Sequence, residues 1–364
     1  MTDLFQTSSL GTQALSRRRF LGLLGGAAAA AGFAACSSSS GAASGGLKTT
    51  DPLPTAIPAG TSLAIASGSQ LQELTFRYSG LLSKLPFKVS SWPNLSAGPD
   101  VINAFRAHSV DVAENAGIPP IQAHFQGTGA RIVAVNLTRR PIYAFATKPH
   151  SDIRSVADFK GKKLAFSQGQ AQGVVLLRAL KAAGLDYKKN KDVHLIPLTS
   201  NQFLPALQSG QVDIAPLWFG QIPSYLEQYE KDGARIIKTD VIDRLDILWS
   251  PDEVLAKPDK VAAIKAYVPY WAQGLVWVYE HPAQWIHDYY VKSQGLTKEQ
   301  GKGVVALSSK PLLPPKWDEA LTWEQETVDL LAEGGFVKKF DASVLFDRRF
   351  EGLTAAAVPE TYRS

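Results

Sequence analysis

The alternation of short β-branched runs with amphipathic stretches, from about residue 60 to residue 240, constrains the fold most. It is the sequence pattern of α/β units arranged around a sheet of mainly parallel strands. Residues 61–67 predict a strand, and residues 70–85 predict a helix with leucines on one face. Since 45% of the 364 residues are hydrophobic and 20% are charged, the chain can build a core, and a disordered chain is excluded.

The predicted elements form two similar sets. The predicted strands are 61–67, 87–92, 110–114, 143–147, 163–167, 193–198, 212–218 and 234–239. The predicted helices are 70–85, a short one from Asp100, 172–183, 201–209, 221–231, 260–279, 282–293, 298–307 and 317–333. Val-Asp-Val-Ala at 110–113 and Val-Asp-Ile-Ala at 212–215 occur at corresponding places in the two sets, which indicates two similar lobes.

Residues 1–35 predict a signal peptide, and Cys36 a lipidation site. Arg17, Arg18 and Arg19 precede an apolar run over 20–35, which is shorter than the roughly 20 residues that span a bilayer. The run is rich in Gly and Ala, as in leaders of the twin-arginine route, although three consecutive arginines leave the register open. Its ending, Phe-Ala-Ala-Cys, resembles a bacterial lipobox, so we expect Cys36 to be acylated and 36–58 to be a flexible tether. The alternative is a buried N-terminal helix with an incidental cysteine.

Composition and motifs argue against several other classes. Cys36 is the single cysteine, so no intrachain disulfide can form. Neither a phosphate-binding Gly-x-x-x-x-Gly-Lys-Ser/Thr loop nor a His-Glu-x-x-His motif occurs, and the six histidines are scattered. A net charge of +5, from 38 basic and 33 acidic residues, is too mild to indicate nucleic-acid binding. We therefore expect no enzyme activity, no cofactor, no metal and no nucleic-acid partner.

Four segments resemble the aliphatic-sulfonate, taurine and nitrate-binding proteins of ABC importers. Residues 109–121 carry the segment that ends Ile-Pro-Pro-Ile, and residues 155–166 resemble the family's Ala-Asp-Leu-Lys-Gly-Lys-Lys stretch. Residues 176–185 resemble the helix that follows, and residues 206–218 resemble a stretch ending in Trp. The resemblance runs from about 60 to 240 and returns around 325–339.

The resemblance implies an α/β fold of the type II periplasmic binding protein class, two lobes with mainly parallel sheets joined by a hinge. Lobe 1 would comprise 59–141 plus about 245–364, and lobe 2 would comprise 142–244. The implied function is the extracytoplasmic solute-binding component of an ABC importer. It would capture a small anion, first of all an aliphatic sulfonate, by closing about 139–143 and 244–249. Its partners would be the permease and ATPase subunits, and it would be a monomer held by lipid on the outer face of the cell membrane.

Matching the family's pattern residue by residue implies ligand-binding positions in the loops between the lobes. Helix N-termini that point into such a cleft carry unpaired N–H groups, which attract an anion. The implied positions are Ser69, Gln70, Ser96, Gly98, Glu114, Asn115, Gln168, Gly169, Gln172, Gly173, Trp218 and Phe219.

The chain departs from the sulfonate-binding pattern in two loops. Glu114 and Asn115 stand where those proteins have small hydroxyl residues, and the second-lobe loop, usually rich in Ser, has Gln168, Gln170, Ala171 and Gln172. A carboxylate in the cleft repels a sulfonate unless it points away or pairs with a base, whereas it would accept hydrogen bonds from a ligand N–H or a cation. Nitrate, bicarbonate or a pyrimidine-like nitrogenous ligand are therefore alternative cargoes. An enzyme on the same fold is a further alternative. However, the sulfinate desulfinase with this fold has a site that resembles a cysteine-dependent one, and the single cysteine of this chain, Cys36, is assigned to lipid.

Overall fold

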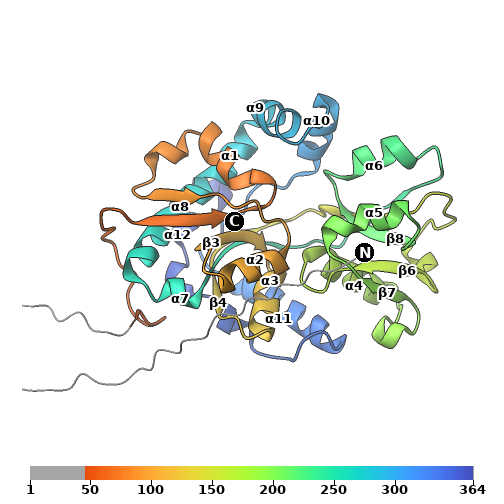
Figure 1. Cartoon of the computed structure of the whole chain (residues 1–364), viewed down its shortest axis with the longest axis horizontal. Helices are drawn as coiled ribbons and strands as arrows, with labels where there is room; N and C mark the ends of the chain where they lie inside the picture. The colour runs from red at the N-terminus through yellow and green to blue at the C-terminus, as the bar shows by residue number, and fades with distance from the viewer. Residues whose placement is uncertain (1–45, 364) are drawn as a thin grey trace, which may run out of the picture. The chain divides into compact units, whose positions relative to one another are not determined.

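The structure is a computed structural model that describes residues 46–363, so the predicted signal peptide and Cys36 lie outside the described residues. Two five-stranded sheets form its framework (Figure 1). The first has the order β2-β1-β3-β10-β4, with β1 at Ser62–Ala66, β2 at Lys88–Ser91, β3 at Val112–Ala116, β4 at Ala130–Leu137 and β10 at Leu245–Pro251. The second has the order β7-β6-β8-β5-β9, with β5 at Tyr143–Thr147, β6 at Lys163–Phe166, β7 at His194–Pro197, β8 at Ile214–Trp218 and β9 at Ile236–Ile237.

Helices lie between and after these strands. They are α1 (Leu71–Tyr78), α2 (Gly98–Arg106), α3 (Ile118–Phe125), α4 (Ala171–Ala182), α5 (Phe203–Gln208), α6 (Ile222–Tyr229), α7 (Asp252–Leu255), α8 (Pro258–Glu280), α9 (Pro282–Trp285), α10 (Lys298–Leu307), α11 (Asp318–Glu333) and α12 (Leu353–Ala356). A π-helix at Ile286–Val291 follows α9, and 3-10 turns lie at 68–70, 81–84, 156–159, 188–190, 200–202, 342–345, 348–350 and 360–362.

Both sheets are mainly parallel, as predicted, and each contains one strand that runs in the opposite direction. In the first, β1 runs parallel to β2 and β3, whereas β10 runs antiparallel to β3 and β4. In the second, β6 runs parallel to β7 and β8, whereas β5 runs antiparallel to β8 and β9. Strands β5 and β10 are the first strands after each passage of the chain between the sheets. Neither belongs to a strand-helix-strand crossover of its own sheet, so nothing imposes parallel pairing on them.

The chain passes between the sheets twice, and the two passages lie side by side. One follows β4 and the other precedes β10. The backbone N–H of Thr138 donates to the carbonyl of Arg244 over 2.8 Å, and the Thr138 hydroxyl donates to the carbonyl of Asp243. These hydrogen bonds continue the β4–β10 pairing, in which Leu137 is opposite Leu245, into the connecting segments.

The core lies between the sheets and the helices that cover them. Helix α8 packs on β1 and β4, and helices α4 and α5 pack on β8 (Figure 1). Trp249 of β10 is fully buried and meets the ring of Phe105 edge-on, with centroids 4.6 Å apart. Within residues 46–363 no helix has the length and apolarity to cross a bilayer.

Several elements differ from the sequence predictions. The helix predicted over 70–85 ends at Tyr78, because Gly80 has a positive φ of 73° and a 3-10 turn follows. Strand β4 and the helices α3, α7 and α12 were not predicted. The helix predicted over 282–293 continues from α9 into the π-helix.

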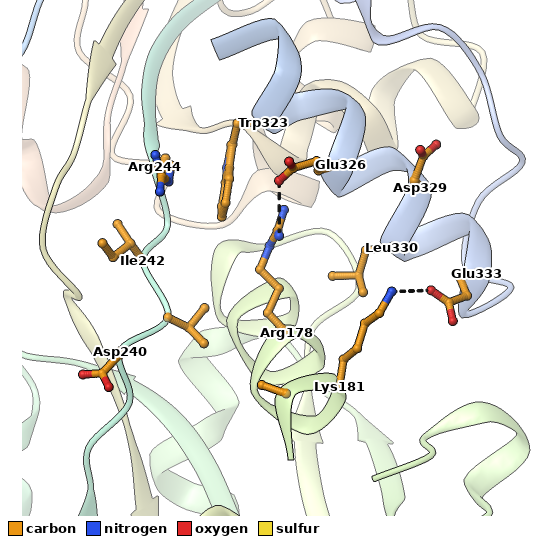
Figure 2. Close-up of a pocket in the computed structure, with 12 residues that line it drawn as sticks. Arg178, Lys181, Asp240, Ile242, Arg244, Trp323, Glu326, Asp329, Leu330 and Glu333 are labelled. Carbon is orange, nitrogen blue, oxygen red and sulfur yellow. Dashed lines mark hydrogen bonds and ion pairs between the residues drawn. The ribbon is translucent and has the colours of Figure 1, made fainter. Parts of the chain in front are cut away.

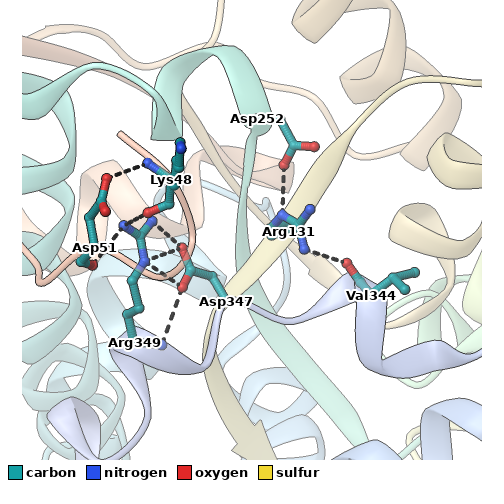
Figure 3. Close-up of polar contacts among 7 residues, drawn as sticks. All are labelled: Lys48, Asp51, Arg131, Asp252, Val344, Asp347 and Arg349. Atoms are coloured by element: carbon teal, nitrogen blue, oxygen red, sulfur yellow. Dashed lines mark hydrogen bonds and ion pairs between the residues drawn. The ribbon is translucent and has the colours of Figure 1, made fainter. Parts of the chain in front are cut away.

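Polar contacts attach the first described residues to the C-terminal part of the chain (Figure 3). Arg349 donates to the carbonyls of Lys48 at 2.8 Å and Asp51 at 3.3 Å. Its guanidinium also pairs with Asp347 at 2.6 Å, and Asp347 is only 1% exposed. These contacts lie inside the predicted tether of 36–58, so the prediction of a flexible tether is wrong for residues 46–58, which pack against the folded domain.

We predict that Gly173→Ala destabilises the protein by about 2 kcal/mol or more, because the new methyl overpacks a close contact with backbone. A Cβ at Gly173 would lie 1.9 Å from the carbonyl oxygen of Ser167. Gly303→Ala in α10 is the matched control, since a Cβ there meets no atom within 4 Å. It should stabilise by about 0.5 to 1 kcal/mol. Urea unfolding of both variants measures the difference, and equal stabilities would contradict the prediction.

Candidate ligand-binding cleft

A cavity of about 460 Å³ lies between the two sheets and is lined from both. Its walls come from the loop before α1, the starts of α2 and α4, the ends of β3 and β8, and the two segments that connect the sheets. The lining residues are Gly68, Ser69, Leu71, Ser96, Gly98, Glu114, Asn115, Ala116, Pro119, Thr138, Ile142, Tyr143, Gln170, Ala171, Gln172, Trp218, Asp243, Leu245, Asp246, Tyr289 and Ser308.

The cavity brings together seven of the twelve sequence-predicted site residues. These are Ser69, Ser96, Gly98, Glu114, Asn115, Gln172 and Trp218. Asn115 is held in place because its side-chain oxygen accepts from the indole N–H of Trp249 over 2.9 Å. The other five lie elsewhere.

Gln168 and Gly169 lie where the lobes touch instead of on the cavity wall. Gln122 of α3 donates to the carbonyl of Gln168 over 3.2 Å, and the side chain of Gln168 donates to the carbonyl of Phe336 over 2.8 Å. A Cβ at Gly98 would lie 2.8 Å from the carbonyl oxygen of Gly169. The glycine at 98 therefore permits a close approach of backbone from the two lobes.

The remaining three predicted residues have other surroundings. Gln70 is exposed and has a positive φ of 57°. Gly173 packs against the backbone of Ser167. Phe219 lines a different, more apolar cavity of about 540 Å³ with Leu226 and Leu307 among its walls.

Sequence reasoning missed four prominent lining residues, Tyr143, Asp243, Asp246 and Tyr289. Asp243 precedes the buried strand β10, and Asp246 is its second residue. Burying an acidic side chain is unfavourable unless it has a polar partner, so these two positions could have been singled out from the sequence. Tyr143 begins another buried strand. Tyr289 carried no usable signal, because the π-helix that positions it does not follow the helical period of 3.6.

One wall of the cavity consists of helix N-termini. Helices α1, α2 and α4 begin at Leu71, Gly98 and Ala171, and all three residues line the cavity. The first N–H groups of a helix have no partner within the helix, and the N-terminus carries a partial positive charge. This wall can therefore bind the negative end of a ligand.

The facing wall is acidic. Glu114 of β3 lies opposite Leu248 of β10, and Ala116 lies opposite Asp246, so both acidic side chains project from the same face of adjacent strands. The indole N–H of Trp271 donates to Glu114 over 3.1 Å, and Asn136 donates to Asp246 over 3.2 Å. Asp243 adds a third carboxyl group from the connecting segment.

Burial raises the pKa of all three acidic groups, and repulsion from neighbouring acids adds to the shift at Asp246. Burial raises the pKa of Glu114, and hydrogen bonds from Gln72 and Trp271 oppose this. Burial raises the pKa of Asp246 well above its ordinary value, with further contributions from the charges of Glu114 and Asp243. Burial raises the pKa of Asp243 to about 7 although Arg178 favours its ionised form. A positive group placed among them would relieve this repulsion.

The lining contains no positive side chain to balance these acids. Within residues 46–363, no Lys, Arg or His lines the cavity. Nor is any group of three or more His, Cys, Asp or Glu side chains in this part of the chain placed to hold a metal ion. The cavity thus combines an electropositive wall of helix ends with an acidic wall.

A second cavity, of about 640 Å³, lies on another side of the connecting segments, between α4 and α11 (Figure 2). The guanidinium groups of Arg178 and Arg244 lie 3.7 Å and 5.2 Å from the ring centre of Trp323. Arg178 pairs with Glu326 at 3.7 Å, and Lys181 pairs with Glu333 at 2.7 Å. These ion pairs connect α4 of one lobe with α11 of the other. The second cavity therefore resembles a structural contact between the lobes more than a ligand site.

We predict that Asp243→Asn reduces the pH dependence of stability. Because the pKa of Asp243 is about 7 in the folded protein, the free energy of unfolding that it contributes is full below pH 4 and is lost as the pH rises to 7. Each pKa unit corresponds to about 1.4 kcal/mol. Between pH 4 and pH 7 the free energy of unfolding of the variant should therefore fall by roughly 2 to 4 kcal/mol less than that of the parent protein.

Urea unfolding between pH 4 and pH 7.5 measures this difference. Asp152→Asn, at a side chain that is 87% exposed, serves as the control and should follow the parent protein. Parallel curves for the parent and Asp243→Asn would show that the residue does not titrate in this range.

Comparisons with known proteins agree with this architecture. A relative of Escherichia coli (strain K12), whose name provisionally assigns it to aliphatic sulfonate binding, is 25% identical over 300 residues, 78% of this chain and 86% of the relative. The crystal structure of the periplasmic aliphatic sulphonate binding protein SsuA from Escherichia coli superposes with a TM-score of 0.65 at 26% identity, covering 78% of this chain and 91% of SsuA.

More distant structures share the fold alone. The alkanesulfonate-binding protein SsuA from Xanthomonas axonopodis, bound to MOPS, has a TM-score of 0.68 at 22% identity, covering 84% of this chain and 99% of the other. The desulfurization enzyme DSZB has a TM-score of 0.53 at 15% identity, covering 81% and 99%. The fold is thus the two-lobed fold of type II periplasmic binding proteins, which binding proteins and enzymes both use.

The family model described as "NMT1/THI5 like" matches residues 96–284, which is just over half of the chain and includes the starts of α2 and α4 and the acidic wall. With its fold, its interlobe cavity and this match, the chain belongs to the NMT1/THI5-like family.

Proposed function

We propose that the protein is the extracytoplasmic solute-binding component of an ABC importer, and that it captures a small organic sulfonate between its two lobes. One observation carries the proposal: a cavity of about 460 Å³ lies between two sheets that, within residues 46–363, are joined by two adjacent segments, with three helix N-termini on its wall. Sites of this kind suit an anionic headgroup.

The arrangement provides a mechanism of capture. The lobes are 59–141 with about 245–364, and 142–244, and they rotate about the connecting segments near Thr138 and Arg244. A ligand favours the closed form only to the extent that it contacts both lobes at once. Ser69 and Ser96 on one lobe and Gln172 and Trp218 on the other can make such contacts. The closed form would then present a surface to the permease.

A sulfonate is the first candidate cargo because the named relatives bind aliphatic sulfonates and because helix N-termini favour an anion. In this proposal the protein binds its ligand without converting it. Its likeness to DSZB is a likeness of fold.

We also propose that the mature protein is a monomer held on the outer face of the cell membrane by acyl chains on Cys36. The consecutive arginines, the short apolar run and the Gly/Ser-rich segment after Cys36 support this part of the proposal. Acyl chains on Cys36 would hold the binding domain at the membrane, beside the permease and its ATPase subunits.

We predict that a sulfonate raises the thermal stability of the full-length chain in detergent. A ligand at one hundred times its Kd, binding the folded state alone, adds about 2.7 kcal/mol to the free energy of unfolding. Alkanesulfonates, sulfate, nitrate, bicarbonate and aminopyrimidines form the thermal-shift panel. A shift with nitrate or an aminopyrimidine, and none with any sulfonate, would contradict the proposed cargo.

We predict that Trp218→Ala weakens binding of the responding ligand at least tenfold, because Trp218 covers the apolar part of the cleft. Trp323→Ala is the matched control: this tryptophan is also partly buried, but it lines the second cavity. Isothermal titration calorimetry measures both affinities. Equal losses of ligand affinity in the two variants would show that Trp218 supports the stability of the fold and does not contact the ligand.

We predict that Cys36→Ser moves the protein from the membrane fraction to the soluble fraction, because the variant cannot be acylated. Ser37→Ala should stay in the membrane fraction. Fractionation and metabolic labelling with palmitate measure the change. Unchanged membrane retention of Cys36→Ser would disprove the lipid anchor.

A further inference from the structure

A cavity of about 540 Å³ lies outside the cleft, between helix α10, helix α6 and strand β9, and we call it the flank cavity. Among residues 46–363, Tyr143 is the one lining residue that it shares with the cleft. Its volume is in the range of sites that bind small molecules. The apolar side chains on its wall include Phe219, Ile222, Pro223, Leu226, Val304 and Leu307.

Contacts of α10 with α6 and with the segment that connects β4 to β5 bring these walls together. Gln300 of α10 donates to Glu227 of α6 over 3.4 Å, and the guanidinium of Arg140 donates to the carbonyl of Ala306 over 3.1 Å. Leu307 nevertheless stays 44% exposed. Apolar surface that the chain itself leaves uncovered becomes more stable when a ligand removes it from water.

The mouth of the flank cavity carries more positive than negative charge. The exposed side chains of Arg140 and Lys238 line it, together with one acidic side chain, that of Asp240. The neighbouring Arg139 pairs with Glu319, whereas Arg140 and Lys238 form no ion pair within residues 46–363. Two cations without acidic partners, next to an apolar wall, suit an anion that carries an alkyl chain.

We propose that the flank cavity binds a medium-chain carboxylate, with its alkyl chain on the apolar wall and its carboxylate at Arg140 and Lys238. Each methylene that leaves water adds to the affinity. The guanidinium and the ammonium both offer N–H donors to the carboxylate. The bound molecule contacts α10, α6 and the connecting segment at once, so it favours the arrangement of the lobes in which these three walls meet.

Three ligands test the proposal: decanoate, 1-decanol and butanoate. Decanoate and 1-decanol differ in charge, whereas decanoate and butanoate differ in chain length. Calorimetry uses the full-length chain carrying Cys36→Ser, so that neither an acyl group nor a detergent competes for the site. Decanoate should bind at one site, at least about tenfold more tightly than either other ligand. Equal affinities for decanoate and 1-decanol, or for decanoate and butanoate, would overturn the proposal.

Two variants test the position of the site. The double variant Arg140→Gln with Lys238→Gln removes both cations and should weaken decanoate binding at least about tenfold. Gly303→Phe should weaken it as much by filling the cavity, because Gly303 lines the cavity and a Cβ there meets no atom within 4 Å. The control, Lys231→Gln with Arg235→Gln, removes two exposed cations that do not line the flank cavity. It should bind decanoate like the parent chain.

Thermal unfolding first shows that each variant is folded. Full decanoate affinity in either test variant would contradict the proposal, because the site needs both its cations and its apolar space. An equal loss in the control double variant would also overturn it, since binding would then follow net charge alone. All of these titrations use ligands without a sulfonate, so their failure leaves the proposed function of the cleft unaffected.

Discussion

The double passage of the chain between its two sheets is the constraint on which the rest of the structure depends. The passages are hydrogen-bonded to each other, from the N–H of Thr138 to the carbonyl of Arg244 over 2.8 Å. Strand β10 therefore re-enters the first sheet between β3 and β4 and runs antiparallel to both. This return brings Asp243 and Asp246 to the cavity, beside Glu114. The same geometry that permits rotation of the lobes thus also creates the acidic wall.

The cleft is electrostatically divided, and this division has consequences for recognition. Helix N-termini favour an anion by roughly 0.3 to 1 kcal/mol each when exposed, and more when partly buried. Buried carboxyl groups at short range oppose an anion with energies of at least that order. The likeness to sulfonate-binding relatives therefore accounts for one half of the cleft, the wall of helix N-termini. The other half depends on acidic residues of this chain, whose pKa values are raised by burial and, at Asp246, also by repulsion from Glu114 and Asp243.

Sequence periodicity predicted most of the elements and the two-set organisation of the strands. It failed where local signals compete with tertiary contacts. Gly80 ends α1 through its positive φ, and the 282–293 helix contains a π-helical segment that positions Tyr289. The predicted site residues that line the cavity, such as Ser69, Gly98 and Trp218, lie at ends of strands and starts of helices. In α/β folds these ends gather at the ligand cleft.

The sequence by itself determined the α/β class, the helix starts that line one wall, and the unusual Glu114 in the cleft. Only the tertiary structure decided that Asp243 and Asp246 join Glu114, since more than 120 residues separate them in the chain. Local patterns report which face of a strand is buried, but not which strand becomes its neighbour. Strand pairing is set by packing of the whole core. For that reason the charge of the acidic wall could be recognised only in the folded protein.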